Sequence, residues 1–379
     1  MLYNQKSLDL HREKKGKIEI RSKVSLETKE DLSIAYSPGV GAVSSAIGED
    51  VSKSCDFTNR CNQVAIVSDG TAILGLGDLG PEAAMPVMEG KSIIFKEFAD
   101  VDAIPLCIDT KDVEEIIKFC KQIQPSFGGI NLEDISAPRC FEILDRLEKE
   151  LDIPVFHDDQ DGTAIVALAA LINACKVSGK KFEDLKIVIN GAGAAGIAAA
   201  RLIMANGAKD IILLDSVGTI YEGREKLNET KEKISKISNL GKVAGGLAEA
   251  MVGSDVFIGL SKGGLVDVEM VKSMNAEPII LAMANPIPEI MPDLALEAGA
   301  SVVGTGRSDF PNQVNNALVF PGLFRGLLDA KIKNITAEMK LAVAKALAGV
   351  LEPTKDMILP EAIDKSVAQV IAEAVKKFK

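Results

Sequence analysis

The sequence predicts an α/β fold with two parallel sheets, the second of them doubly wound, and helices at the C-terminal end. In both halves of the chain, short apolar runs alternate with segments of helical periodicity, which is typical of parallel sheets covered by helices. A glycine-rich turn lies between a predicted strand and a predicted helix at residues 191–196. The chain has 379 residues, which is enough for two or three domains with cores of their own.

The first domain is expected to span residues 1–160 and to hold a small, mostly parallel sheet. Its predicted strands are 63–67, 104–108 and 154–156, and its predicted helices are 113–123 and 138–150. The apolar run at 162–177 predicts a long buried helix that leads into the next domain.

The second domain is expected at residues 161–310 and has the sharper alternation of strands and helices. Its predicted strands are 186–189, 210–214, 256–259, 278–282 and 301–303, and its predicted helices are 196–206 and a charged one at 222–237. Residues 311–379 form a C-terminal helical segment, with helices near 337–348 and 363–377, that we expect to pack back on the first domain.

Composition excludes several classes of protein. A net charge of −11 argues against nucleic-acid binding, which requires a basic surface. The N-terminus lacks an apolar signal core, and no uninterrupted apolar run reaches the roughly 18–20 residues of a membrane span. The six cysteines are scattered without a CxxC pair, so we expect free structural thiols in a reducing compartment rather than disulfides or zinc. These features predict a cytoplasmic protein.

The pattern GxGxxG occurs twice, and its context distinguishes the two copies. The copy at residues 191–196 follows a predicted strand, precedes a predicted helix, and has Asp215 at the end of the next strand. This is a Rossmann-type dinucleotide site, in which glycines let the backbone approach the pyrophosphate and the acidic residue binds the adenine ribose. Because an acidic residue there repels the 2′-phosphate of NADP, NAD is favoured. The residues assigned to the cofactor are Gly191, Gly193, Ala194, Ala195, Gly196, Asp215 and Asn285.

The other copy, at residues 75–80, is expected to be a tight turn near the substrate. It carries Asp78 inside the turn, where a carboxylate opposes a pyrophosphate, and Pro81 follows directly.

Two acidic pairs, Glu133-Asp134 and Asp158-Asp159, lie among apolar residues. Buried carboxylates are costly unless something positive neutralises them, and an all-oxygen set suits Mg²⁺ or Mn²⁺. A metal site followed by a nicotinamide site indicates oxidation of a metal-chelated hydroxy acid. The simpler interpretation of Glu133 and Asp134 is that they begin a helix at 135–139, where acidic residues are favourable.

Seven blocks, in order, make the chain resemble the malic enzyme family in its short microbial form, over nearly its whole length. They are AYSPGV at 35–40, SDG with ILGLGDLG at 68–80, GK at 90–91, NLED at 131–134, DDQDGTA at 158–164, ANP at 284–286, and QVNN with FPG at 313–322.

The resemblance implies roles for individual residues. It makes Glu133, Asp134 and Asp159 the metal ligands, with Asp158 close by. It assigns Lys91 as general base and Tyr36 as general acid, while Asn285 with Asn315 or Asn316 binds the substrate carboxylate. The implied reaction is oxidative decarboxylation of L-malate to pyruvate and CO₂ with reduction of NAD or NADP. A lysine serves as the base if burial and the cation bring its pKa towards neutrality.

Simpler interpretations exist for these residues as well. Tyr36 fits an ordinary loop tyrosine, Lys91 a solvated lysine, and the asparagines turn or capping residues. His157 is expected to be a packed neighbour, and with only two histidines in the chain no His-based zinc site or triad can be built.

One departure from the family concerns the substrate carboxylate. Larger malic enzymes have an arginine where this chain has Ala72, so another positive charge is needed. Arg307 is the candidate, and its replacement by alanine is then expected to raise the KM for malate far more than that for NAD. Lys262 is a second basic residue, on the nucleotide side.

Rival functions stay open at this point. A malolactic-type enzyme returns the hydride and releases lactate, another metal-assisted hydroxy-acid dehydrogenase uses similar groups, and an NAD-sensing protein needs no turnover. The short form implies a homodimer, in which the segment 8–34 helps to build the interface and brings Tyr36 to a partner's site.

Overall fold

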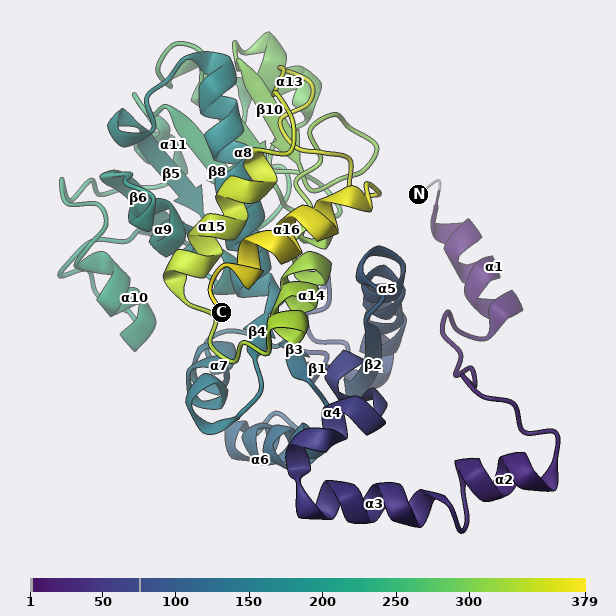
Figure 1. The fold of residues 1–379 in the computed structure, drawn as a ribbon. Helices are drawn as coiled ribbons and strands as arrows, with labels where there is room; N and C mark the ends of the chain where they lie inside the picture. Colours follow the sequence, from purple (N-terminus) through teal and green to yellow (C-terminus); the bar gives the residue numbers. More distant parts are fainter. Residues whose placement is uncertain (1–2, 75) are drawn as a thin grey trace.

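Two parallel sheets, one after the other along the chain, organise the protein (Figure 1). The structure is a computed structural model that describes residues 3–74 and 76–379, so Gly75 of the first glycine motif lies outside the described residues. The first sheet has the order β2-β1-β3-β4 and is parallel throughout. Its strands are β1 (Gln63–Ser68), β2 (Asp102–Cys107), β3 (Gly129–Leu132) and β4 (Val155–His157).

Helices cover the first sheet because their apolar faces pack against its buried strands. The helices α6 and α7 share one hydrophobic cluster with β3 and β4, whereas α5 packs on the opposite side, next to the second domain. The bounds are α5 (Pro81–Ala99), α6 (Val113–Ile123) and α7 (Arg139–Glu150), with short turns η1 (Val51–Lys53), α4 (Ser54–Phe57), η2 (Asn59–Asn62) and η3 (Gln124–Ser126).

The second sheet has six strands in the order β10-β9-β8-β5-β6-β7, all parallel except β7. The strand order reverses between β5 and β8, which is where doubly wound sheets bind their ligands. The strands are β5 (Lys186–Asn190), β6 (Asp210–Asp215), β7 (Gly218–Thr219), β8 (Val256–Gly259), β9 (Ile279–Ala282) and β10 (Val302–Thr305). The helical segments are η5 (Phe182–Asp184), α9 (Ala194–Ala205), α10 (Glu229–Ser235), α11 (Leu247–Met251), α12 (Val268–Lys272) and α13 (Pro292–Glu297).

One long helix joins the two halves. The turn η4 (Asp158–Gly162) continues into α8 (Thr163–Ser178), and together they are apolar and long enough to cross a membrane by length and composition. Of the most apolar window of this helix, 72% is buried inside the protein, so packing in the core accounts for its composition.

The C-terminal helices contact both halves. Phe320 and Phe324 of α14 pack against Phe95 of α5 in tilted and edge-to-face arrangements, with ring centroids 4.7 and 5.4 Å apart, while α15 packs on α8 and α9. The segments are η6 (Asn316–Leu318), α14 (Phe320–Ala330), α15 (Ala337–Ala348) and α16 (Ser366–Lys376).

The N-terminal segment has a different character. Its helices α1 (Asn4–Lys14), α2 (Lys29–Ala35) and α3 (Val40–Glu49) contain no buried residue and stand away from the body of the protein in Figure 1. Large apolar side chains are nevertheless exposed along it, with Ile20 at 98% exposure. A segment of this kind lacks, within its own protomer, the surface that its apolar side chains require.

Two predictions about this fold are wrong. The charged helix at 222–237 is only the seven residues of α10, because the preceding stretch forms turns around Tyr221 and Arg224. Cys55 and Cys61 form a disulfide with a Cα–Cα distance of 5.0 Å, because the short turns of α4 and η2 bring them together, while the other four cysteines are free.

Candidate active site

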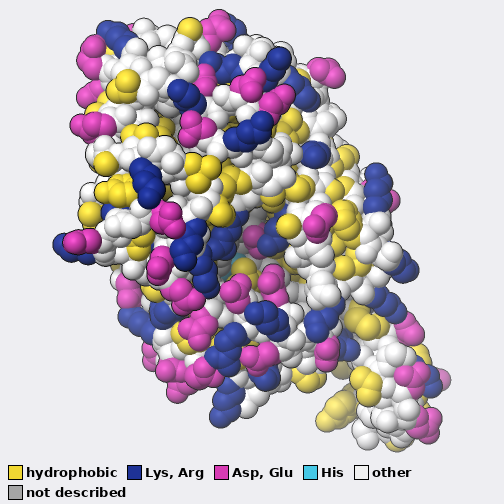
Figure 2. All heavy atoms as spheres, turned by 90° about the vertical axis from the view of Figure 1, so that its left-hand side faces the viewer, with side chains coloured by type: hydrophobic (Ala, Val, Ile, Leu, Met, Phe, Trp, Pro, Cys, Tyr) yellow, Lys and Arg dark blue, Asp and Glu magenta, His cyan; other side chains and the backbone are white. Residues whose placement is uncertain are grey.

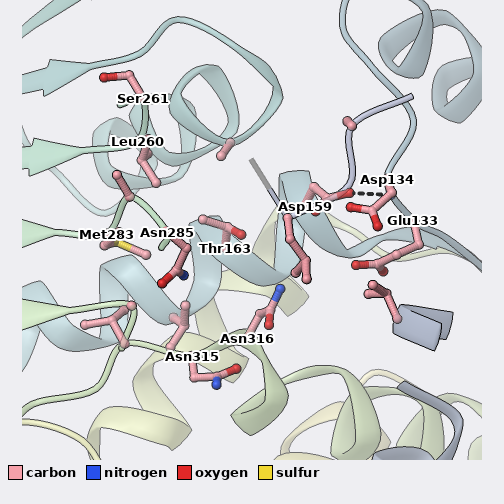
Figure 3. Close-up of a pocket in the computed structure, with 18 of the residues that line it drawn as sticks. Glu133, Asp134, Asp159, Thr163, Leu260, Ser261, Met283, Asn285, Asn315 and Asn316 are labelled. Atoms are coloured by element: carbon pink, nitrogen blue, oxygen red, sulfur yellow. Dashed lines mark hydrogen bonds between the residues drawn. The ribbon is translucent and has the colours of Figure 1, made fainter. Parts of the chain in front are cut away.

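A cleft of about 400 Å³ lies between the two sheets, where their strands end (Figure 3). Figure 2 shows the molecule hollowed between its upper and lower halves, with charged side chains on both rims. Both sheets contribute to its wall, as expected when the carboxyl ends of parallel strands face each other. The residues lining the cleft include Ala72, Leu74, Lys91, Glu133, Asp134, Asp159, Thr163, Ala195, Leu260, Ser261, Met283, Asn285, Asn315 and Asn316.

Three carboxylates form one group at the first-sheet side of the cleft. Glu133, Asp134 and Asp159 each offer an oxygen, and these atoms lie within 4.8 Å of one another. Glu133 and Asp134 follow strand β3, and the backbone N–H of Asp134 donates to Asp159 Oδ2 at 2.9 Å (Figure 3). Because α7 begins only at Arg139, the alternative that the acidic pair starts a helix is wrong.

The charge state of this group shows what it can hold. Burial, together with mutual repulsion, raises the pKa of Glu133 to about 7 and that of Asp134 to about 8. Burial raises the pKa of Asp159 as well, and Asp134 Oδ2 is buried without a hydrogen-bond partner. A hard divalent cation fits such a set, since it supplies the positive charge and the ligand positions that these oxygens lack.

Lys91 faces the acidic group from the middle of α5. Its Nζ lies 2.5 Å from Asp158 Oδ2 and 2.5 Å from Glu133 Oε1, and 4.7 Å from the centre of the Phe320 ring. Burial lowers the pKa of Lys91, but the carboxylates of Asp158 and Glu133 outweigh this effect and the net shift is upward. The expected lowering of the Lys91 pKa combined burial with a nearby cation; burial acts in that direction here, and the two carboxylates act against it.

The turn η4 that carries Asp158 and Asp159 is π-helical, a geometry found mostly at functional sites. It fits because Gly162 has no side chain: a Cβ there would lie 1.8 Å from Asp158 Oδ1. His157, just before the turn, is fully buried with its Nδ1 3.7 Å from Asp159 Oδ2, as expected for a packed neighbour.

The three asparagines lie on the second-sheet side of the cleft. Asn285 follows β9, and Figure 3 shows its side chain and that of Asn316 directed into the space beside Asp159. Asn315 also caps the turn η6, because its Oδ1 accepts from Ala317 N at 2.9 Å. The capping interpretation therefore applies to Asn315, although this residue also lines the cleft.

The second glycine motif has the geometry that a dinucleotide turn requires. Gly191 follows β5 with a φ of +121°, and a Cβ on Gly196 would lie 1.8 Å from Gly191 O, so helix and turn pack closely. Gly193 faces open space, and Ala194 and Ala195 begin helix α9. These are the three glycine roles of a pyrophosphate-binding turn. In the first motif, Gly80 N instead donates to Gly70 O, and Asp78 pairs with Lys111.

Asp215 ends strand β6 as expected, but its carboxylate is not free. Arg224 binds both of its oxygens, Lys231 Nζ binds Oδ2 at 2.7 Å, and Val217 N binds Oδ1 at 2.9 Å. The predicted repulsion of a 2′-phosphate assumed an unpaired carboxylate, which the structure does not have.

Two predicted residues do not reach this cleft within the protomer. Tyr36 caps the exposed helix α2 and is itself 68% exposed. Arg307 is paired with Asp309 through two hydrogen bonds of 2.8 and 2.6 Å, and its Nη1 donates to Pro286 O. Among the described residues that line the cleft, Lys91 is the sole basic one, so Arg307 does not replace the arginine missing at Ala72. Lys262 is exposed and outside the lining.

Sequence reasoning missed one important residue, Glu289. It is fully buried and accepts hydrogen bonds from Ser261 N at 3.2 Å and Ala284 N at 3.1 Å, so it ties the loop after β8 to the loop after β9. A Cβ on Gly259 would lie 2.1 Å from its carboxyl carbon. The sequence signal for this role was a glutamate that lies between prolines and apolar residues. The signal was not sufficient, because the two hydrogen-bond donors to Glu289 come from loops that are separate in the sequence.

Comparison with known proteins agrees with this geometry. Residues 15–148 match the family described as malic enzyme, N-terminal domain, and residues 160–378 match malic enzyme, NAD binding domain. The bifunctional malic/malolactic enzyme of Bacillus subtilis is 53% identical over 100% of this chain and 93% of its own length. The NAD-dependent malic enzyme of Geobacillus stearothermophilus is 54% identical over 95% of this chain and 76% of its own.

A solved structure gives the same result. The NAD-dependent malic enzyme of Thermotoga maritima is 48% identical, with a TM-score of 0.95 over 97% of this chain and 98% of its own. Two domain families that together cover most of the chain, and relatives above 50% identity along it, leave one conclusion: this chain belongs to the malic enzyme family.

Proposed function

We propose that this chain catalyses the oxidative decarboxylation of L-malate to pyruvate and CO₂, with reduction of NAD or NADP and with Mg²⁺ or Mn²⁺ at the acidic group. The observation that carries the proposal is the composition of one cleft. Glu133, Asp134 and Asp159 face Lys91 there, and Ala195 of the dinucleotide turn lines the same space.

Glu133, Asp134 and Asp159 would hold the metal, which would supply positive charge for the oxygen on C2 of malate. Lys91 is the basic group that takes the proton of the C2 hydroxyl, after passing its own proton to Asp158 Oδ2 at 2.5 Å. A nicotinamide dinucleotide held by the glycine turn at residues 191–196 would accept the hydride, with its electron pair, from C2. The C3–C4 bond then breaks, the C4 carboxylate leaves as CO₂, and C3 must receive one proton.

Tyr36 is the proposed donor of that last proton, and it can act only if another protomer supplies it. The exposed position of α2, the apolar side chains displayed by the whole N-terminal segment, and the absence of Tyr36 from its own cleft support this arrangement. We therefore propose a homodimer in which each N-terminal segment reaches the partner's cleft.

Asn285 and Asn316 are the proposed ligands of the substrate carboxylate, with Asn315 beside them. Neutral amides donate hydrogen bonds to a carboxylate without reducing the attraction between substrate and metal. Close packing supports the position of Asn285, since a Cβ on Gly306 would lie 2.6 Å from its Nδ2.

We also place the domain boundaries at residues 1–160, 161–310 and 311–379, and we propose a cytoplasmic location without nucleic-acid or membrane partners. The net charge of −11 and the burial of the apolar helix α8 in the core support these assignments.

The test is an assay of purified protein with L-malate, Mn²⁺ and either NAD or NADP, in which reduced cofactor and products are measured together. Reduced cofactor that appears in step with pyruvate, and stops when a chelator is added, is the expected result. Bound cofactor without any turnover would instead support an NAD-sensing protein.

A malolactic activity is the second candidate, because the bifunctional malic/malolactic enzyme of Bacillus subtilis matches the whole chain at 53% identity. In that reaction the hydride returns to pyruvate and lactate is released. Lactate formed from malate without net reduced cofactor distinguishes it in the same assay.

A further inference from the structure

Arg139, the first residue of α7, pairs with a buried aspartate outside the cleft. Its Nη1 lies 2.8 Å from Asp69 Oδ2, and the Asp69 side chain has no exposed surface. The backbone N–H and the hydroxyl of Thr71 donate to the other oxygen of Asp69, at 3.1 and 2.6 Å. None of these three residues lines the cleft. The ion pair nevertheless reaches the acidic group through a short chain of hydrogen bonds.

The hydroxyl of Thr71 joins this ion pair to the loop that follows β3. Thr71 Oγ1 accepts from Arg139 Nη2 at 3.0 Å and from Ser136 N at 2.9 Å. A hydroxyl has one proton to donate and two lone pairs, so the bond to Asp69 and these two bonds fill its capacity. Arg139 also donates from Nη2 to Ser136 Oγ at 3.1 Å and from Nη1 to Lys111 O at 2.8 Å. The guanidinium therefore holds together the loops that follow β1, β2 and β3.

These loops meet at Asp134, one of the three carboxylates of the acidic group. Ala72 N donates to Asp134 O at 2.9 Å, and Asp134 N donates to Asp159 Oδ2 at 2.9 Å (Figure 3). Asp134 has a φ of +53°, in the left-handed region that few residues other than glycine adopt. Such a conformation persists only where the surrounding structure determines it. The contacts from residues 71–72 therefore supply part of the constraint on Asp134.

The loop at residues 69–72 is itself held from its other side. Gly70 has a φ of +69°, and a Cβ there would lie 2.2 Å from Gly80 O. Gly70 O in turn accepts from Leu79 N and from Gly80 N, both at 3.2 Å. Because backbone packs directly on backbone here, Thr71 has a defined position from which to act on Asp134.

We propose that the Arg139–Asp69 ion pair positions the metal ligand Asp134, acting through the hydroxyl of Thr71. The ion pair holds this hydroxyl in place, and the loop of Thr71 holds the Asp134 backbone in its left-handed conformation. The proposal rests on the proposed metal at the acidic group. Residues that orient metal ligands from outside the site typically change metal affinity by about 10–100-fold when they are replaced. An ammonium cannot replace this guanidinium, because its donors leave a single nitrogen and cannot reach separate loops at once.

The test is calorimetric titration of the metal-free protein with Mn²⁺, in the absence of substrate and of turnover. Thr71→Val removes the hydroxyl with little change in size and should weaken Mn²⁺ binding about tenfold or more. Thr71→Ser retains the hydroxyl and should keep the wild-type affinity. Arg139→Lys keeps the charge but loses the contacts with separate loops, so it should weaken Mn²⁺ binding to a similar extent as Thr71→Val.

Arg146→Lys is the matched control, because Arg146 lies on the same helix but pairs with Glu114 and Glu150. It should bind Mn²⁺ as the wild-type protein does. Unfolding temperatures in chelator show which variants lose stability alone. Unchanged Mn²⁺ affinity in Arg139→Lys and Thr71→Val, an equal loss in Thr71→Ser or Arg146→Lys, or a wild-type protein that does not bind Mn²⁺ would overturn the proposal. If the affinities change as expected but malate is not oxidised, the proposed reaction fails and the positioning role stands.

Discussion

Asp158 and Lys91 form a buried ion pair, with 2.5 Å between Oδ2 and Nζ, that joins the π-helical turn before α8 to the middle of α5. The pair holds the proposed base next to the proposed metal ligand Asp159, one residue further along the turn.

Asp158→Asn should lower kcat on the order of 10²-fold, because Lys91 then loses the group that takes its proton, a contribution typical of a positioned acid–base partner. The variant keeps the shape of the side chain, and Glu133 still pairs with Lys91, so it should fold. Steady-state kinetics and circular dichroism check this. The control is Asp161→Asn, in the same turn but paired with Lys340, which should keep its kcat. An equal loss in both variants would show that the effect is structural.

Asp159→Asn should abolish stabilisation by Mn²⁺. A ligand that binds only the folded state, at 100 times its Kd, adds about 2.7 kcal/mol to the free energy of unfolding. The wild-type protein should therefore unfold at a higher temperature with Mn²⁺ than with a chelator, and Asp161→Asn should behave likewise. Scanning calorimetry with and without the metal measures this. A shift that persists in Asp159→Asn would place the metal elsewhere.

Mixing two inactive variants should restore activity if Tyr36 serves the partner's cleft. A dimer of one Tyr36→Phe protomer and one Lys91→Met protomer has one site with both intact residues. After random exchange, half of the dimers are mixed and half of their sites are complete, so activity should recover to about a quarter of the wild-type value. Turnover after exchange through mild denaturant tests this. If no activity returns although mixed dimers are found by mass, each Tyr36 serves its own protomer.

Glu289 should make stability depend on pH. Burial raises its pKa from 4.5 to about 6, so between these values the folded state binds more protons than the unfolded state. Stability should then fall as the pH rises through this window, by about 2 kcal/mol in all. Urea denaturation at pH 4.5 to 7 should show this slope in the wild-type protein and not in Glu289→Gln. The exposed Glu297→Gln is the control and should retain it.

The sequence was a good guide where the physical signal is local. The helix at 113–123 was predicted with its observed bounds, because an amphipathic stripe runs along it and the capping residue Asp112 directly precedes it. The glycine turn at 191–196 was equally readable, since backbone conformation and close packing there depend on the glycines themselves. The strand β3 was missed, because Gly129-Ile-Asn-Leu is short and its burial comes from neighbouring strands.

The properties of the site could not be predicted from the sequence where they depend on residues that are distant along the chain. The acidic residues and Lys91 were found, but the upward shift of the lysine pKa depends on Asp158, 67 residues away. The pairing of Asp215 with Arg224 and Lys231 likewise depends on turns after β6 that were predicted to be helix. Nor does any local pattern reveal that Arg307 turns to Asp309.

The helix α8 begins four residues after Asp159, and most of its side chains are alanine, valine, isoleucine or leucine buried against α9 and α15. A cation needs its ligands placed to within a fraction of an ångström. The position of the Asp159 carboxylate therefore depends on how tightly the side chains of the interior pack around helix α8. Ala167 and Ala170 are both fully buried, so a methyl group added at either position would displace helix α8 from its neighbours. Random mutagenesis scored by turnover will therefore recover substitutions in the protein interior that are indistinguishable, by rate alone, from damage to the metal ligands.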